Sequence, residues 1–413
     1  MSGINKRRAL PSAVDVVVVG AGFAGLSAAQ RLMSMGRSVL VLEGRDRVGG
    51  RSLTGEVAGI PVDFGATWVA KRHTAIRDLA RRMGCTITAQ YKDGRNVLWK
   101  EGRRHTYKGT IPVLSPIALV DMIRMQSALN RLVATIDVDA PWVSPQAEKL
   151  DSISFAEWLD LKRAHRATRS LMVIVSKVQW GCLPGDVSLL HVLRYIKAAG
   201  GIDHMLDVEN GQQEERIVET TQEIAKRIAA KLGDRLHLNR PVQRIAQNGH
   251  GVRVSTASGE IRADYAIVTV PPAMRAEIEF EPALPQQAEG MTKTWRMGEL
   301  SKAFVAYDRP FWRADGLSGE ALTDTGAVFI TFDVSPSPSG PGILMTFCDP
   351  RAFDGFGPQE RRSRVIEKVI DLFGPLAANP IDYVDHCWGQ EPFSPGGPNP
   401  AVGPFATTSF GRA

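Results

Sequence analysis

The hydrophobic and polar positions of the first sixty-five residues predict a strand, a helix and a second strand. A β-branched run at 14–19, between Pro11 and a glycine, is typical of a buried parallel strand. The next apolar residues recur at helical spacing until Gly36, which favours a helix end: Leu26, Ala29, Leu32 and Met33. Residues 38–42 form a second apolar run that ends in Glu43. The order strand, helix, strand, acid indicates a nucleotide-binding unit.

Farther along the chain the pattern is less regular. Residues 226–232 end a predicted helix at Gly233, and 236–238 begin a predicted strand. The Gly- and Pro-rich stretch 335–342 is typical of a turn between strands rather than a linker. The sequence contains no internal repeat, so we expect no solenoid or propeller.

A glycine motif joins the first predicted strand to the helix. Its sequence, Gly20-Ala21-Gly22-Phe23-Ala24-Gly25, matches GxGxxG. In such a motif the first glycine allows a tight turn, the second admits a pyrophosphate, and the third lets helix and sheet pack closely. Glu43 follows 18 residues after Gly25 and is placed to accept hydrogen bonds from ribose hydroxyls. A lone motif is equally well explained by a structural turn, but the flanking strands, helix and acid favour dinucleotide binding.

The residues after the acid separate FAD from NAD. The stretch 44–51 adds Arg45, a glycine pair and Arg51, and 63–68 adds a further glycine turn. A guanidinium can hold a phosphate through two hydrogen bonds, and glycines let the backbone approach it. The alternative is a solvated arginine-rich loop.

Six blocks of the sequence resemble the flavin-containing monoamine oxidase family, in its bacterial branch. The first is the fingerprint at 16–68 with its Gly-Gly-Arg element, and the others follow in the family's order along nearly the whole chain. They are 186–214 with Asn210-Gly211-Gln212-Gln213-Glu214, 232–242, 267–272, Leu300-Ser301-Lys302 before Pro310-Phe311-Trp312, and Trp388-Gly389-Gln390-Glu391-Pro392-Phe393-Ser394.

The resemblance implies roles for individual residues. Lys302 would hold a water against flavin N5, and Leu206 and Gln213 would face the substrate. The alternative for Lys302 is a surface lysine on a strand. FAD contacts are implied for Gly20, Gly22, Phe23, Ala24, Gly25, Glu43, Gly44, Arg45, Gly49, Gly50, Arg51, Gly65, Ala66, Thr67, Val242 and Val270.

The sequence departs from the family pattern near its end. The stretch 393–399 contains no cysteine, which excludes a thioether to flavin there, so we expect non-covalent FAD. Neither Pro398 nor Asn399 can supply the aromatic ring that many members place beside the amine. The chain ends at Ala413, before the family's Gly-Thr-Glu flavin contact, second aromatic residue and closing helix. We therefore expect an impaired flavin pocket and, as an alternative, a non-catalytic FAD-binding remnant.

The resemblance implies an α/β fold in which a Rossmann-like FAD-binding domain is interleaved with a mixed-sheet and helical substrate domain. The FAD domain would comprise 1–88, 215–290 and 388–413, and the substrate domain 89–214 and 291–387. The implied reaction oxidises an amine to an imine and then an aldehyde, with dioxygen reduced to hydrogen peroxide.

Composition and charge argue against nucleic acids and membranes as binding partners. The formal net charge is +6, but 50 Lys and Arg are scattered among 44 Asp and Glu, which indicates solvated surface rather than a nucleic-acid patch. The clusters at 6–8 and 103–105 are short. No run approaches the roughly 18–20 apolar residues that span a bilayer. The nearest, 111–133, is interrupted by charges, and residues 1–11 have no signal-peptide core.

Cysteine and histidine usage gives little competing chemistry. Four cysteines without a CxxC pair argue against disulfides and zinc and fit a reducing compartment, so we expect a cytoplasmic protein without a metal. The eight histidines are dispersed and favour surface or capping roles. Trp180 is expected in the core rather than around the amine. The expected partners are an amine and dioxygen, and a homodimer is left open.

Two other enzyme classes share the first motif. An L-amino-acid oxidase would need an arginine for the substrate carboxylate, and no clear candidate follows 63–68. A carotenoid-desaturase-like or protoporphyrinogen-oxidase-like flavoprotein would not be expected to carry the 210–214 block together with Lys302. Amine oxidation is the function that the sequence favours.

Overall fold

The computed structural model of the chain describes residues 9–109, 112 and 115–412. The basic cluster Lys6-Arg7-Arg8, Ile111 at the start of the interrupted apolar run, and Ala413 lie outside the described residues. No described helix combines the length and apolarity that crossing a membrane requires.

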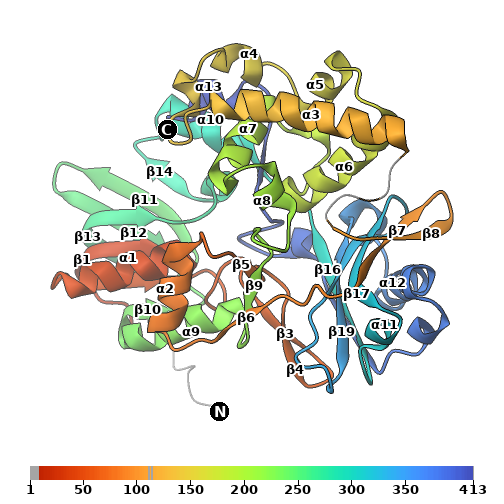
Figure 1. The fold of residues 1–413 in the computed structure, drawn as a ribbon. Helices are drawn as coiled ribbons and strands as arrows, with labels where there is room; N and C mark the ends of the chain where they lie inside the picture. The colour runs from red at the N-terminus through yellow and green to blue at the C-terminus, as the bar shows by residue number, and fades with distance from the viewer. Residues whose placement is uncertain (1–8, 110–111, 113–114, 413) are drawn as a thin grey trace.

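A seven-stranded sheet forms the first layer and contains the predicted nucleotide-binding unit (Figure 1). Its centre is parallel: β1 pairs with β2 on one side and β13 on the other. In sheet order the strands are β10 (Leu236–His237), β2 (Val39–Leu42), β1 (Ala13–Val19), β13 (Gly259–Val268), β12 (Gly251–Thr256), β11 (Val242–Asn248) and β14 (Glu279–Glu281).

The N-terminal elements follow the hydrophobic pattern closely. Helix α1 (Phe23–Ser34) ends one residue beyond Met33, and Gly36 follows with a positive φ of 77°. Helix α9 (Thr221–Leu232) ends at Gly233 as predicted. Both helices pack on β-branched strand residues, because α1 and α9 share one buried cluster with Val16, Val18, Val39 and Val41.

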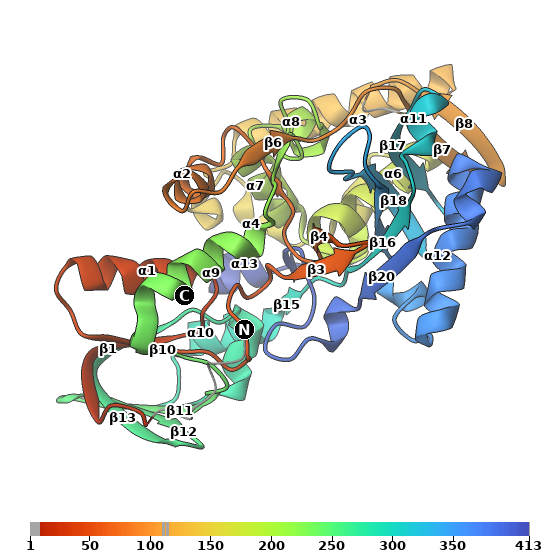
Figure 2. The ribbon, with the colours of Figure 1, turned by 90° about the horizontal axis from the view of Figure 1, so that it is seen from below.

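The second seven-stranded sheet forms a separate layer, with α12 (Pro358–Phe373) on one side (Figures 1 and 2). Its middle strands are buried at every position, which explains their nearly continuous apolar sequence. In order they are β20 (Asp382–His386), β16 (Ser301–Tyr307), β19 (Gly342–Cys348), β18 (Val328–Asp333), β17 (Leu317–Thr323), β7 (Arg95–Lys100) and β8 (Arg103–Tyr107). The stretch predicted as a turn, 335–342, connects β18 to β19.

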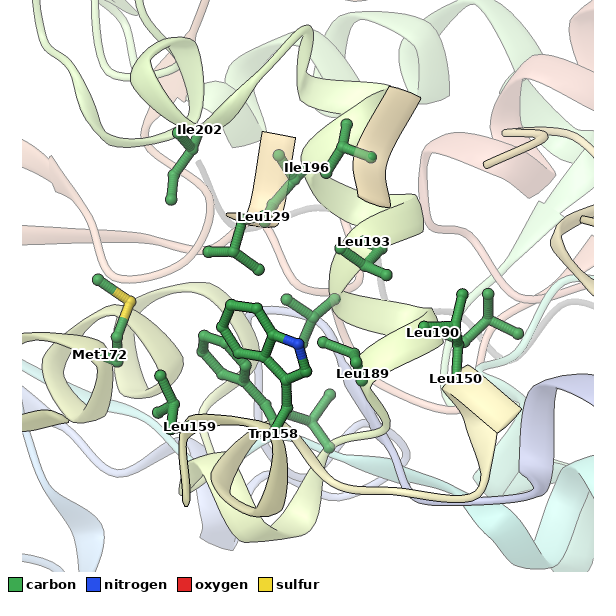
Figure 3. Close-up of a cluster of buried hydrophobic side chains, with 14 of the residues drawn as sticks. Leu129, Leu150, Trp158, Leu159, Met172, Leu189, Leu190, Leu193, Ile196 and Ile202 are labelled. Carbon is green, nitrogen blue, oxygen red and sulfur yellow. The ribbon is translucent and has the colours of Figure 1, made fainter. Parts of the chain in front are cut away.

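A third layer consists of helices, drawn above the second sheet in Figure 1. Its core is a cluster of leucine, isoleucine and methionine side chains around Trp158 (Figure 3). Trp180 is fully buried in the same cluster, as expected from the sequence. The helices are α3 (Pro116–Ala134), α4 (Ala147–Asp151), α5 (Phe155–Leu161), α6 (Arg166–Trp180), α7 (Leu189–Ala199) and α8 (Ile202–Leu206).

Short elements join the layers. Strands β3 (Thr54–Val57) and β4 (Ile60–Asp63) form a hairpin, and β5 (Trp68–Val69), β9 (Glu215–Ile217) and β6 (Ile87–Ala89) form a small sheet. Strand β15 (Trp295–Met297) pairs with β21 (Pro400–Val402). The remaining helices are α2 (Thr74–Arg82), α10 (Gln286–Thr294), α11 (Phe311–Ala314) and α13 (Ala406–Phe410).

The α/β class is confirmed, because parallel strands and helices build the first layer and a mixed sheet with helices builds the rest. The first large sheet takes its strands from 13–42 and 236–281, and the second from 95–107 and 301–386. The chain therefore crosses between the layers several times. The exact domain boundaries stay a prediction.

Candidate active site

A cavity of about 1260 Å³ lies where loops of the first sheet meet β16 and β19 of the second. It exceeds the ~300–1,000 Å³ typical of a site for a drug-sized molecule. Seventeen residues singled out in the sequence line it together: Gly20, Gly22, Phe23, Ala24, Glu43, Gly44, Arg45, Gly49, Gly50, Arg51, Gly65, Ala66, Thr67, Gln213, Val242, Val270 and Lys302. Residues that are far apart in the sequence therefore line the same cavity.

The glycine loop opens into one end of this cavity. Gly22 is the N-cap of α1 and makes no side-chain cap, so the first amides of the helix lack an intrahelical partner. Gly22 and Gly50 face each other: a Cβ added to Gly50 would lie 3.4 Å from the Cα of Gly22. Side chains here would fill the space that a diphosphate needs, whereas a helix N-terminus attracts one. This end fits the diphosphate of FAD.

Glu43 is buried beside the glycine loop and braces it. Its Oε2 accepts a hydrogen bond from the amide of Ala21 at 2.7 Å, and its Oε1 accepts one from the amide of Arg45 at 3.0 Å. The carboxylate therefore has a fixed position at the end of β2. Its remaining lone pairs can accept from hydroxyls of a ligand.

The two predicted phosphate arginines differ in their partners. Arg45 is buried and donates from Nε to the carbonyl of Pro392 at 2.8 Å, from Nη1 to the carbonyl of Gly50 at 3.1 Å, and from Nη2 to Ser394 Oγ. Arg51 is exposed and, within the described residues, donates only from Nη1, to the carbonyl of Pro398 at 2.9 Å. Arg45 therefore fixes the wall of the cavity, and Arg51 keeps donors for a ligand.

Glu391 and His386, which were not predicted as site residues, contact residues near Arg45. Glu391 accepts from Arg47 at 2.8 Å and lies 3.3 Å from His386 Nε2. These contacts, with His386 first, lower the pKa of Glu391 to about 2. The His386 ring also stacks on Phe64 at 5.3 Å. Acid and arginine are more than 300 positions apart, so no spacing in the sequence could have paired them.

Lys302 lines the cavity from β16. Its side chain is only 4% exposed, so the surface-lysine alternative is wrong. Nζ donates to the carbonyls of Asp63 and Gly65 at 3.1 and 2.6 Å and to Thr67 Oγ1 at 2.7 Å. Three acceptors match the three protons of an ammonium. The loop between β4 and β5 thereby orients Lys302.

The electrostatics of Lys302 depend on a buried acid. Burial lowers the pKa of Lys302 to about 7, and the nearby Asp63 carboxylate opposes that shift. Burial likewise raises the pKa of Asp63 to about 7, opposed by a hydrogen bond from the Thr221 amide at 2.8 Å and by Lys302. Burial thus disfavours the charged form of each group, and the opposite charge of the other group favours it.

A second, mostly apolar cavity of about 410 Å³ adjoins the first. Val178, Gln179 and Gln213 line both spaces, so they form the shared wall. Leu206, predicted to face the substrate, lines this second cavity and not the first. The Oε1 of Gln213 is buried without a hydrogen-bond partner among the described residues, which leaves an acceptor for a ligand.

Three polar side chains near that shared wall form a network. The hydroxyl of Tyr195 donates to Gln179 Oε1 at 3.2 Å. Asn399 Nδ2 donates to the Tyr195 hydroxyl at 3.0 Å and to the Gln179 carbonyl at 2.8 Å. Asn399 stands where many family members have an aromatic residue. Through these bonds it anchors the C-terminal part of the chain to α6 and α7. Only the tertiary structure shows this role.

One residue predicted to contact FAD, Gly25, lies outside the cavity. Gly25 does not line it but packs against the glycine loop, where a Cβ would lie 2.0 Å from the carbonyl oxygen of Gly20. None of the four cysteines lines it, in agreement with non-covalent flavin. Among the described residues there is no cluster of three or more His, Cys, Asp or Glu that could hold a metal.

Comparisons with known proteins match almost the whole chain. The model of the family described as flavin containing amine oxidoreductase matches residues 23–410. A protein of Mycobacterium tuberculosis described as a flavin-containing monoamine oxidase is 50% identical over 402 residues, covering 97% of this chain and 88% of the relative.

Two solved structures share the fold. A wild-type putrescine oxidase bound to putrescine superposes with a TM-score of 0.91 at 28% identity, covering 97% of this chain and 90% of that one. The cyclohexylamine oxidase of Brevibacterium oxydans IH-35A gives a TM-score of 0.91 at 29% identity, with the same shares of the two chains.

Proposed function

The chain belongs to the flavin-containing amine oxidoreductase family, and on that premise we propose how its own residues bind the cofactor and the amine. The protein is an FAD-dependent oxidoreductase that oxidises amines, with hydrogen peroxide as the product from dioxygen. The relatives reported above are all named as oxidases of amines. These names do not favour the alternative that the protein is an L-amino-acid oxidase.

We propose that the glycine-lined end of the large cavity holds the FAD diphosphate. The uncapped N-terminus of α1 supplies amides, and Arg51 supplies free guanidinium donors. Glu43 lies where the adjoining ribose would hydrogen-bond. Lys302, Thr67 and Phe347 line the same cavity and would contact the part of FAD that carries out the redox chemistry. We propose the other FAD contacts implied by the sequence because those residues also line this cavity. Gly25 does not line it and would act only by packing against the glycine loop.

When bound, FAD accepts an electron pair from the carbon that carries the amine and passes it to dioxygen. The chain's own groups prepare the amine for that transfer. Gln213 offers a free Oε1 to the substrate nitrogen, and the apolar second cavity, with Leu206, excludes water from the substrate chain. The imine then hydrolyses to an aldehyde.

Lys302 is the residue to which we assign a catalytic role. Its ammonium, held by Asp63, Gly65 and Thr67, puts a fixed positive charge and a donor beside the cavity. A preorganised donor of this kind stabilises negative charge as it develops, and can hold a water proton in place. The proposal that Lys302 orders a water rests on this geometry.

The observation that carries the proposal is the continuous lining from the glycine loop to buried Lys302. The test is direct: purify the protein, record the flavin spectrum, then add an alkyl amine without oxygen. We expect an oxidised-flavin spectrum that bleaches, and peroxide once oxygen is admitted. Protein that stays colourless after saturation with FAD and desalting would contradict the cofactor site.

Replacing Arg51 by alanine should weaken FAD retention. A charge-assisted contact to phosphate contributes about 1.5–3 kcal/mol, so the FAD dissociation constant should rise about 10- to 100-fold. Flavin released on dilution, followed by fluorescence, measures this. Arg37, an exposed arginine just beyond α1, provides a control, because Arg37→Ala should leave retention unchanged. Equal retention in both variants would remove Arg51 from the site.

We propose a cytoplasmic location for the enzyme. All four cysteines are free, and Cys85, Cys348 and Cys387 are buried as thiols, which suits a reducing compartment. A homodimer stays a prediction, for which light scattering of the purified protein is the measurement.

A further inference from the structure

His386 lies beside Lys302 but does not line the large cavity, and the proposed function gives it no role. The two residues are direct partners in the antiparallel pairing of β20 with β16 (Figure 2). Directly paired residues project from the same face of a sheet, with their Cβ atoms about 4.5–5.5 Å apart. The His386 ring is therefore the cross-strand neighbour of the side chain to which we assign a catalytic role.

The flat side of the His386 ring packs on the loop that holds Lys302. It stacks on Phe64, with 5.3 Å between the ring centroids and 15° between the ring planes. The carbonyls on either side of Phe64, those of Asp63 and Gly65, accept hydrogen bonds from Lys302 Nζ. A stack that fixes Phe64 therefore also fixes two of the acceptors that orient the ammonium.

The edge of the His386 ring reaches the glycine-rich wall of the cavity through one carboxylate. Its Nε2 lies 3.3 Å from Glu391 Oε1 and, within the described part of the chain, has no other hydrogen-bond or ion-pair partner. Glu391 Oε2 accepts from Arg47 Nη2 at 2.8 Å, and Arg47 Nη1 donates to the carbonyl of Gly50 at 2.9 Å. Gly50 lines the part of the cavity where we place the FAD diphosphate. One histidine thus contacts both the Lys302 loop and the support of the diphosphate site.

We propose that His386 is a positioning residue with two separable tasks: its ring orients Lys302 through Phe64, and its Nε2 steadies the diphosphate site through Glu391. The inference rests on the proposed function, because FAD must bind in this cavity with Lys302 beside its redox-active part. The contacts of Glu391 lower its pKa to about 2, so the imidazole N–H has a charged acceptor. His386 lines neither cavity, so it acts only through its neighbours.

Three substitutions of His386 separate the two tasks. His386→Leu removes both contacts, so flavin reduction by amine should slow about tenfold and the FAD dissociation constant should rise about tenfold. His386→Phe keeps a ring to stack on Phe64 and should restore the reduction rate but not FAD retention. His386→Gln keeps an N–H for Glu391 and should restore FAD retention but not the rate. Anaerobic stopped-flow at saturating FAD measures the rate, and the fluorescence of flavin released on dilution measures retention.

Asp385→Asn is the matched control for a loss of stability alone. Asp385 precedes His386 on β20, so its side chain lies on the opposite face of the sheet. There it accepts two hydrogen bonds from Arg361, at 3.1 and 2.9 Å. The Tm of Asp385→Asn should fall, whereas its reduction rate and FAD retention should stay at the wild-type values.

Equal losses of rate and retention in His386→Phe and His386→Gln, or wild-type values in all three His386 variants, would overturn the inference while amine oxidation stands. The same holds if Asp385→Asn reproduces both losses, because stability alone would then explain them. The Phe and Gln variants, compared with the wild type, carry the test even if His386→Leu does not fold. Wild-type protein that retains no flavin, or whose flavin no amine bleaches, would contradict the proposed function instead.

Discussion

Replacing Lys302 by methionine is expected to leave FAD bound but to slow turnover about one hundredfold or more. The reason is the loss of a preorganised positive charge beside the reacting centre, where removing one such donor typically costs a factor of about 10²–10³. Lys302 lines the cavity, and three acceptors hold its ammonium in place. Stopped-flow measurement of flavin bleaching by amine, and of reoxidation by oxygen, shows which half-reaction slows.

The same substitution has a structural consequence that must be measured separately. Methionine leaves the carbonyls of Asp63 and Gly65 without their donor and removes one of the positive charges near the buried Asp63 carboxylate. A buried acceptor left without its donor costs about 1–3 kcal/mol, so a lower Tm is expected. Lys177→Met is a control, because Lys177 lies outside the cavity and pairs with Asp349. If Lys302→Met turns over at the wild-type rate, Lys302 has no catalytic role.

Replacing Gly25 by alanine is expected to give the largest loss of stability among conservative single substitutions in the glycine loop. The added Cβ would lie 2.0 Å from the carbonyl oxygen of Gly20 and 2.8 Å from Thr269 Oγ1. Backbone cannot move away as a flexible side chain can, so α1 must separate from β1. Overpacking of this kind costs about 3 kcal/mol, at the upper end of the usual range.

The loss should be visible both in unfolding and in cofactor content. Because α1 positions the amides at the diphosphate end, moving it should also lower FAD occupancy, which the ratio of flavin to protein absorbance measures. Gly185→Ala is the matched control: a Cβ there meets no atom within 4 Å, and the variant should keep the wild-type Tm. A Gly25→Ala protein with unchanged Tm and flavin content would contradict the close packing of α1 on the loop.

The sequence by itself determined the nucleotide-binding unit and its cofactor. Short-range sequence patterns are sufficient there, because β1, the glycine turn, α1 and β2 follow one another along the chain. Each strand or helix has its own hydrophobic periodicity, and glycines mark where the elements end. The helix ends at Met33–Gly36 and at Gly233 were predictable for the same reason. Lys302 was found only through resemblance, since a lysine in an apolar strand carries no local signal of burial.

The tertiary structure alone decided what surrounds these residues. Arg45 bonds to Pro392 and Ser394, and Lys302 to the 63–67 loop, because the chain returns to the first layer after building the second. Periodicity fixes which face of a strand is buried, whereas long-range pairing fixes which charges share a cavity.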